Sequence, residues 1–290
     1  MLLTPVVLAL ATRLGLAPAP LAMTTVWLAN TASLLLPVSN LTNLLSLHRM
    51  QALGVGLGGY LSLTWAPALA AVTVTVLVLG LLFRGRLAGR YVAPAHVPAA
   101  DRTLLLVATV VCLLLGPAFV TGVPVAWPAS VGAGVLVVVF AARDRRALRW
   151  SLVPWQLVLG VGVLFAVVQV AGAHGLTGLL ARLAGDGHGF VAYLRLATVA
   201  AVGANGVDNL PAYLALEPVA DDAPARLVAL LVGVNTGPLL TLWASLATLL
   251  WRERCRSAGL QVSGWRFAAR GLVLVPMVLV AGCAALAAVA

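Results

Sequence analysis

Amides and hydroxyls gather in two apolar stretches of this chain, one near each end. The first, Ala29–Leu45, contains three asparagines, two threonines and two serines, and the second continues from Asn235-Thr236 to Leu250. Such neutral groups both donate to and accept from a hydroxylated, uncharged solute. With the polar residues between Asn205 and Asn209, they supply the candidate binding residues Asn30, Thr31, Asn205, Asn209, Asn235 and Thr236. The alternative interpretation is polar packing between membrane helices.

Asp208 is the one acid expected near the middle of the membrane. Intramembrane acids commonly relay protons or bind ions, so Asp208 is the candidate proton-coupling group. The competing interpretation is a structural cap on the helix that follows it, a role that aspartate fills well. The residues alone leave both roles open.

The two polar stretches correspond in sequence. At an offset of 205, positions 30–45 and 235–250 share an Asn, a Thr and five leucines. Just upstream, Pro5–Leu10 parallels Pro211–Leu216 at an offset of 206. A continuous span would bury these polar groups in lipid without hydrogen-bond partners. Each unpaired group would then cost about 2–7 kcal/mol. Two interrupted helices in corresponding places are typical of a transporter's binding site.

The composition is that of a polytopic membrane protein. Hydrophobic residues make up 62% of the chain, charged residues 9%, and the mean hydropathy is +1.07. The net charge of +10 comes from arginines in short loops, which is the positive-inside pattern and argues against nucleic-acid binding. Three scattered cysteines and four histidines form no metal-ligand spacing, and nothing in the sequence calls for a metal or a cofactor.

The apolar runs predict an all-helical chain with re-entrant hairpins and two broken helices. The expected elements are a short leg up to Arg13, a broken span 19–47, an interfacial piece 51–63, spans 64–83, 103–122, 124–142 and 152–171, an interfacial piece 175–185, a re-entrant hairpin 190–217 with legs of about 14 residues, a broken span 224–251 and a last span 267–289.

The arginine-rich loops orient these elements. If successive spans cross the membrane in opposite directions, loops 84–102, 143–149 and 252–266 all lie on the same side of the membrane. We expect that side to be cytoplasmic. The two broken spans then run in opposite directions, as an inverted repeat requires. We therefore divide the chain into an incomplete first repeat, 1–90, and a second repeat, 91–290. Because residue 1 aligns inside a repeat, we expect about 105 residues of the first repeat to lie upstream.

Several of these motifs resemble the arsenical pump membrane protein (arsenite permease) family of the ion transporter superfamily. They are Ala29-Asn30-Thr31 with Ser39–Asn43, Asn205 with Asp208–Pro211, Gly233–Pro238, Ser245–Trp251, and Gly264-Trp265 with Phe267. The resemblance implies an inverted-repeat carrier in the cell membrane that exports arsenite or antimonite in exchange for protons. It also raises an arsenical pump ATPase subunit and a second copy of the chain as partners.

Two other classes stay open beside this one. A citrate or dicarboxylate carrier of the same superfamily would want a cationic group at the breaks, and the sequence places no arginine close to either. A non-transporting membrane protein or an inactive fragment is the remaining alternative. A membrane enzyme is disfavoured because no His/Asp/Glu or Ser/His cluster stands near one face.

Overall fold

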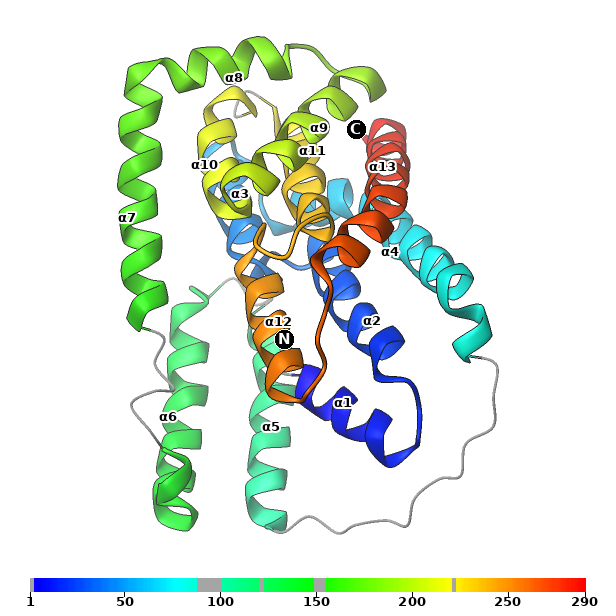
Figure 1. Cartoon of the computed structure of the whole chain (residues 1–290). Coiled ribbons are helices and arrows are strands. Elements are labelled where there is room, and N and C mark those ends of the chain that lie inside the picture. Colours follow the sequence, from blue (N-terminus) through cyan, green and yellow to red (C-terminus); the bar gives the residue numbers. More distant parts are fainter. Residues whose placement is uncertain (1–2, 88–100, 120–122, 149–154, 221–222) are drawn as a thin grey trace. The chain divides into compact units, whose positions relative to one another are not determined.

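A computed structural model describes the chain except residues 1–2, 88–100, 120–122, 149–154 and 221–222. The described residues are helical and include no strand (Figure 1). They form two compact units, one of residues Met1–Pro94 with Leu164–Ala290 and the other of Ala95–Val163. The predicted all-helical class is confirmed.

The larger unit begins with four helices. They are α1 (Leu3–Arg13), α2 (Pro18–Thr31), α3 (Leu41–Ala52) and α4 (Leu57–Leu87), with short 3₁₀ turns at Ala32–Leu35 and Pro37–Ser39 between α2 and α3. The unit continues, after a kink at Gly172–Leu176 where His174 and Gly175 have non-helical backbone angles, with α8 (Thr177–Ala184), α9 (Phe190–Val207), α10 (Asn209–Ala220), α11 (Pro224–Thr236), a 3₁₀ turn at Gly237–Leu239, α12 (Leu246–Ser257) and α13 (Gly264–Val289).

The smaller unit contains α5 (Arg102–Ala118), α6 (Ala126–Arg143) and a 3₁₀ turn at Arg145–Ala147, while α7 (Trp155–Ala171) is divided between the two units. The backbone of α6 approaches α5 closely at Gly132. A β-carbon there would lie 3.2 Å from the side chains of Val111 and Leu115. Asp101 caps α5 by accepting hydrogen bonds from the backbone N–H groups of Thr103 and Leu104, at 2.8 and 3.0 Å.

Several helices have the length and composition of membrane spans. Within the described ranges, five segments qualify by length and composition: Leu57–Arg86, Ala126–Arg143, Ala166–Ala184, Phe190–Val207 and Gly264–Val289. Ala166–Ala184 is not one straight helix, because it is kinked at His174 and Gly175. Many of their apolar side chains are exposed, such as Leu81 and Val138. This pattern suits lipid rather than water as the surrounding medium.

Two boundary predictions were wrong. Residues 51–63 are not a separate interfacial piece, because α4 begins at Leu57 and runs unbroken for 31 residues. The first hairpin leg is 18 residues long instead of about 14, since α9 continues to Val207. Asn205 does not end that helix because its amide donates back to the carbonyl of Ala201, 2.8 Å away.

The helix bounds repeat along the chain. Helices α3 and α12 begin 205 residues apart and end 205 residues apart, and α2 and α11 both begin at a proline. Asn40 and Ser245 cap the second halves with their side chains. The same halves end alike, at Gly54 with φ 81° and Gly259 with φ 78°, each followed by a 6→1 hydrogen bond to Met50 or Cys255.

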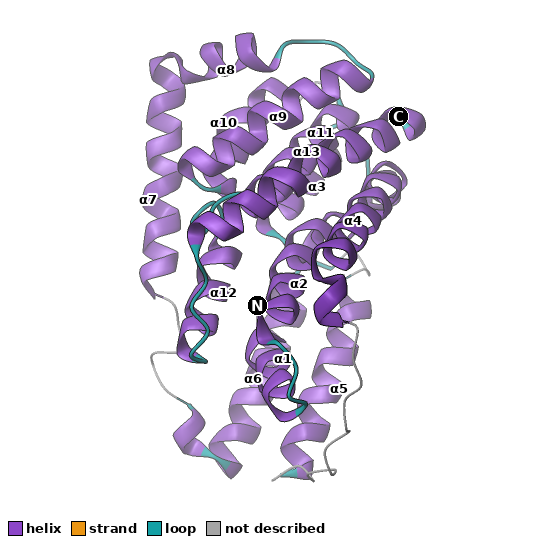
Figure 2. Ribbon diagram, turned by 45° about the vertical axis from the view of Figure 1, so that its right-hand side comes forward, coloured by secondary structure: helices purple, strands orange, loops and turns teal. Residues whose placement is uncertain are grey.

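The halves of the two interrupted helices pack against each other, each second half against the first half of the other helix. Helix α3 contacts α10 and α11, whereas α12 contacts α1 and α2 (Figures 1 and 2). The indole N–H of Trp251 on α12 donates to the carbonyl of Ala22 on α2, 2.9 Å away. The second half of each interrupted helix therefore lies beside the first half of the other.

Glycines bring α9 unusually close to α11. A β-carbon on Gly233 would lie 2.3 Å from the carbonyl oxygen of Ala197, and one on Gly237 would lie 2.7 Å from that of Ala201. Small residues four apart allow helix backbones to approach in this way within membranes. The contact fixes α9 to the residues at which α11 is interrupted.

Candidate functional site

The first helix break follows directly from the local sequence. Helix α2 ends at Thr31, and Pro37 both lacks an N–H and forces the preceding residue out of the helical region. Leu36 accordingly has extended angles, φ −111° and ψ 124°. The chain resumes a helix at Leu41, after Asn40 has capped it by accepting from the N–H of Thr42 at 3.4 Å.

Side chains satisfy the backbone groups that the first break frees. The carbonyl of Ser33 accepts from Nδ2 of Asn43 at 2.7 Å and also from the hydroxyl of Ser39. The carbonyl of Leu34 accepts from the hydroxyl of Tyr60 at 2.9 Å, and Ser33 donates to the carbonyl of Asn30 at 2.7 Å. Buried carbonyls need such partners because an unpaired one costs about 1–3 kcal/mol.

The second break follows similar chemistry. Helix α11 ends at Thr236, and Gly237-Pro238 leads through a 3₁₀ turn into non-helical backbone. Helix α12 begins at Leu246, where Ser245 accepts from the backbone N–H of Thr248 at 3.1 Å. Each break thus contains a proline in a 3₁₀ turn and ends at a polar residue that caps the next helix.

Asparagine side chains join the two breaks. The amide oxygen of Asn235 accepts from Nδ2 of Asn40 at 2.8 Å, and its own Nδ2 donates to Oδ1 of Asn43 at 2.9 Å. Asn43 in turn reaches the carbonyl of Ser33. The result is a chain of amide hydrogen bonds from the first break to the end of α11.

The connection between α9 and α10 is tied to the second break. Asn205 donates to the carbonyl of Gly237 and accepts from the hydroxyl of Thr241, both at 2.8 Å. Its carbonyl accepts from the indole N–H of Trp243 at 2.9 Å, and the backbone N–H of Asn209 donates to the carbonyl of Ala244 at 2.9 Å. Asn205 therefore positions the α9–α10 connection against α11 and its break.

Asp208 has a strained backbone at the turn between α9 and α10. Its φ is 91°, which makes it the one non-glycine residue with positive φ in the described part of the chain. Its carboxylate accepts from the N–H of Leu210 at 3.2 Å, so it also caps α10. Strain of about 1–3 kcal/mol persists only where the surroundings enforce it, and it often marks functional positions.

The residues predicted from the sequence divide into two groups. Asn235, Asn205 and the backbone of Asn209 take part directly in the hydrogen bonds of the second break. The others lie nearby: Asn30 is linked to the first break through Ser33, the hydroxyl of Thr31 lies 3.2 Å from that of Thr75 on α4, and Thr236 is buried at the end of α11.

Asn40 and Asn43 are not among the binding residues predicted from the sequence, although both lie in the first polar stretch. The comparison of repeats aligned Asn40 with Ser245 and Asn43 with Thr248, so neither was an Asn–Asn match. The signal available was the capping pattern, because a polar residue just before an apolar helical run marks a helix start. Thr75 and Thr241 gave no signal, since single threonines are common in membrane helices.

The groups that hold the two breaks together are neutral amides, hydroxyls and backbone carbonyls. Such a surface suits an uncharged hydrogen-bonding solute. In the described ranges, no group of three or more His, Cys, Asp or Glu side chains is placed to hold a metal ion.

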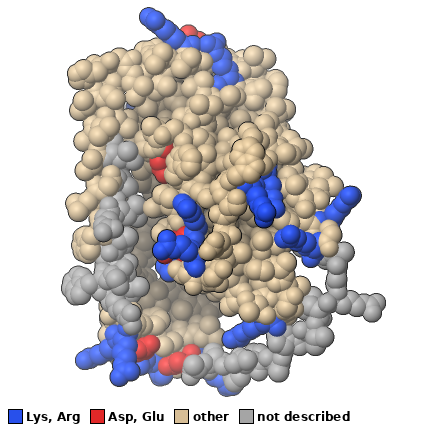
Figure 3. Space-filling model, viewed as in Figure 1, with Lys and Arg blue, Asp and Glu red and all other residues tan. Residues whose placement is uncertain are grey.

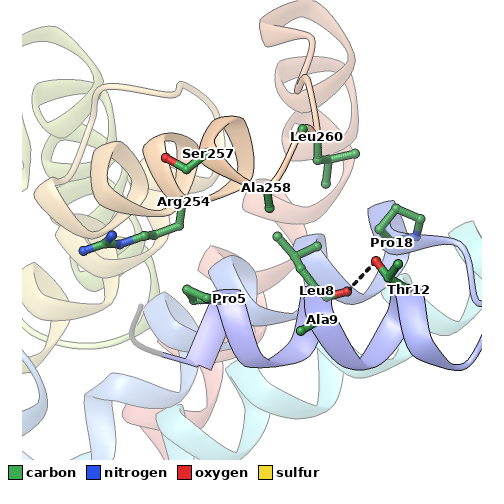
Figure 4. A pocket seen from close by; sticks show the side chains of 10 residues that line it. Pro5, Leu8, Ala9, Thr12, Pro18, Arg254, Ser257, Ala258 and Leu260 are labelled. Atoms are coloured by element: carbon green, nitrogen blue, oxygen red, sulfur yellow. Dashed lines mark hydrogen bonds between the residues drawn. The ribbon is translucent and has the colours of Figure 1, made fainter. Parts of the chain in front are cut away.

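A separate pocket lies between α1 and the end of α12 (Figure 4). Leu8 and Thr12 face it from α1, and Arg254 and Ser257 come from α12. None of the predicted site residues lines it. The hydroxyl of Thr12 is already used, since it donates to the carbonyl of Leu8 at 3.0 Å.

Comparison with known proteins places the chain among transporters. A family model described as citrate transporter matches residues 1–248. The arsenical pump membrane protein of Escherichia coli strain K12 is 31% identical over 99% of this chain and 72% of its own length, and that of Yersinia enterocolitica is 29% identical over the same shares. A 46 kDa membrane protein of Mycobacterium leprae is 28% identical over 94% of this chain and 68% of its own length.

No solved structure matches the chain significantly. The matching family is a transporter family by name and the relatives are membrane proteins by name, which agrees with the candidate membrane spans among the described residues. The chain therefore belongs to the citrate-transporter family, as a multi-pass transporter of the inner membrane and not an enzyme.

Proposed function

We propose that the protein exports arsenite or antimonite and that the proton gradient drives this export. The observation that carries the proposal is the set of neutral amides and hydroxyls that meets where the two helices are interrupted. Arsenite near neutral pH is an uncharged trihydroxy species, so these groups match its hydroxyls without needing a cation. Two relatives at 31% and 29% identity carry the name arsenical pump membrane protein, which supports the same substrate.

In this proposal the two interrupted helices form the core of an inverted repeat. The 205-residue offset between α3 and α12 and the crossed packing of the halves support it. The α9–α10 pair acts as a re-entrant hairpin whose tip lies beside the substrate. Asn30, Thr31, Asn205, Asn209, Asn235 and Thr236 contact or position the substrate, with Asn40 and Asn43 added to them.

Asp208 is the proposed proton carrier. Its carboxylate is half-buried at the proposed hairpin tip and accepts a hydrogen bond from the backbone N–H of Leu210. A charged acid at the middle of the membrane costs about 2.5–3.5 kcal/mol on insertion scales, which favours protonation at one stage of the cycle. An acid that alternates between dry and wet surroundings can move one proton per turnover.

The test is arsenite uptake by the full-length gene product in everted vesicles energised by a proton gradient. We expect uptake by the wild type, loss of gradient-driven uptake in Asp208→Asn, and full uptake in Asp186→Asn, which removes an exposed acid elsewhere. Asn keeps the size of the side chain and tolerates positive φ, so the fold should survive. Full gradient-driven uptake in Asp208→Asn would remove this residue from the mechanism.

A carboxylate carrier is the second candidate, because the matching family model is described as citrate transporter. The same vesicles, offered citrate, succinate and arsenite in parallel, separate the two substrates. Uptake of citrate or succinate without arsenite uptake would assign the function to the second candidate. Uptake of none of the three by folded protein would favour a non-transporting role.

The proposal includes two assembly partners, an ATPase subunit of the arsenical pump and a second copy of the chain. Both follow only from the resemblance to the arsenical pump membrane protein family. Purification in mild detergent with mass measurement of the complex tests them together. A single monomeric species with no retained ATPase would contradict both.

A further inference from the structure

Three arginines line one small pocket where α2, α12 and α13 meet the end of α4. They are Arg86 from the last turn of α4, and Arg266 and Arg270 from the first turns of α13. The pocket measures 120 Å³, which is room for about four water molecules at 30 Å³ each. Gln261 and Ser263 add polar groups to its wall. On the face drawn in Figure 3, basic side chains gather over this region.

The position of Arg270 is fixed by the protein. Its guanidinium carbon lies 5.1 Å from the centre of the Phe83 ring, and Phe83 is buried. A cation over an aromatic face in this range is attracted to it, which orients the guanidinium. Helix α13 begins at the same place, where Ser263 caps it by accepting from the backbone N–H of Arg266. The dipole of the helix adds partial positive charge at this end.

No carboxylate of the described residues is paired with the arginines of this pocket. Among the residues that the structure describes, none of the three arginines forms a salt bridge. Like charges that share a small pocket repel one another, and Arg270 is partly buried whereas Arg86 and Arg266 are exposed. An anion bound between the guanidinium groups would relieve this repulsion and accept several charge-assisted hydrogen bonds.

The pocket also lies where a membrane surface is expected. Helices α4 and α13 are both candidate spans, and the pocket is formed at the end of one and the start of the other. Trp265, beside Arg266, is 77% exposed, and exposed tryptophans at span ends mark the level of the lipid headgroups. The adjoining arginine loops are predicted to be cytoplasmic, where the lipid surface is anionic.

We propose that Arg86, Arg266 and Arg270 bind a phosphate group, supplied by the headgroup of an anionic phospholipid. The planar guanidinium groups suit the bidentate recognition of phosphate oxygens. The site is separate from the two helix breaks and does not depend on which substrate is carried. Free inorganic phosphate offers the same chemistry, so the experiment must distinguish the two sources.

The experiment measures lipid retention by native mass spectrometry of the full-length protein from nanodiscs. One set of nanodiscs contains phosphatidylcholine alone and another contains phosphatidylcholine with one-third phosphatidylglycerol. We expect the wild type to retain phosphatidylglycerol at least fivefold more than the triple variant Arg86→Gln, Arg266→Gln, Arg270→Gln. The control triple variant Arg13→Gln, Arg182→Gln, Arg252→Gln removes the same charge from exposed arginines elsewhere and should retain lipid as the wild type does.

Three outcomes would overturn the proposal. They are equal retention by the two triple variants, equal retention of phosphatidylcholine and phosphatidylglycerol by the wild type, and displacement of the lipid by millimolar inorganic phosphate, which would assign the pocket to the free ion. The variant Arg266→Lys, Arg270→Lys guards against misfolding, because it keeps the charge but not the planar fork. We expect it to fold and to bind the lipid at a level between the wild type and the triple glutamine variant.

Discussion

The side-chain amides of Asn40 and Asn235 meet directly, with Nδ2 of Asn40 2.8 Å from Oδ1 of Asn235, although 195 residues separate them in the chain. Asn43 bonds to the same amide from its other side. Both hydrogen bonds link one helix break to the other, so the polar groups that would be costly in lipid satisfy one another inside the protein. The two breaks are therefore parts of a single polar centre.

Removing Asn235 should destabilise the protein by more than removing a typical surface residue. Asn235→Ala leaves Asn43 Oδ1 and Asn40 Nδ2 without their partner, at a cost of about 1–3 kcal/mol. The double variant with Asn43→Ala should cost less than the sum of the two single changes, by about 0.5–3 kcal/mol. Unfolding in mixed detergent micelles measures all three. Strict additivity would show that the amide pair is not coupled.

Gly233→Ala should weaken the contact between α9 and α11. The new β-carbon would lie 2.3 Å from the carbonyl oxygen of Ala197, so α9 must move, at about 1–3 kcal/mol. Gly80→Ala is the control, since no atom lies within 4 Å of a β-carbon at that position in α4. Thermal unfolding should show a lower midpoint for the first variant and an unchanged or higher one for the second. Equal midpoints would contradict the close approach.

Gly54→Ala and Gly259→Ala should destabilise the protein by similar amounts. Both glycines have positive φ, at 81° and 78°, where an alanine costs about 1–2 kcal/mol. Gly56→Ala has no such restriction and should lie within about 0.5 kcal/mol of the wild type. The same unfolding assay compares the three. A large difference between Gly54→Ala and Gly259→Ala would show that the two helix ends are not equivalent.

Reporter fusions should place residue Arg146 in the cytoplasm and the C-terminus after Ala290 outside it. The expectation follows from the arginine-rich loops, because loops rich in arginine usually stay on the cytoplasmic side of the membrane. A phosphatase fusion should be active at the C-terminus and inactive at Arg146. A fluorescent protein that folds only in the cytoplasm should give the opposite pattern. The same signal at both positions would reject this orientation.

Asp101 should titrate below the usual range of an aspartate. The backbone N–H of Leu104 contributes most to lowering its pKa, and Arg143, whose guanidinium lies 3.1 Å from the carboxylate, and the N–H of Thr103 add to the effect. A lowered pKa favours the folded state above the unfolded pKa of 3.8, and this contribution is lost as the pH falls through the lower folded value. Carbon-13 NMR of the labelled carboxyl group checks the direction. If Asp101 titrated with the same midpoint in Arg143→Gln as in the wild type, the ion pair with Arg143 would be excluded as a cause of the lowered pKa.

The sequence was enough to predict the membrane class, the two interruptions and the offset between them, because prolines and buried polar residues have few acceptable environments in lipid. It did not predict that Asn40 and Asn43 would reach α11, since a contact across 195 residues depends on how the helices pack. The predicted hairpin leg was also shorter than α9, because the polar residues from Asn205 onward were expected in the tip of the hairpin and not in the helix. In the structure that amide is satisfied within its own helix and by Gly237.

The close fit of Gly233 and Gly237 against α9 limits how the molecule can move. A carrier must expose its site to one side of the membrane at a time, and backbones in such close contact cannot slide without a clash. Helices α9 and α11, joined further by Asn205, should therefore travel as one rigid body. The amides of Asn40 and Asn43 can release Asn235 while leaving every helix intact, so the joint that opens during transport is expected between these three side chains. Spin labels on α3 and α11 should change their separation when substrate binds, whereas labels on α9 and α11 should not.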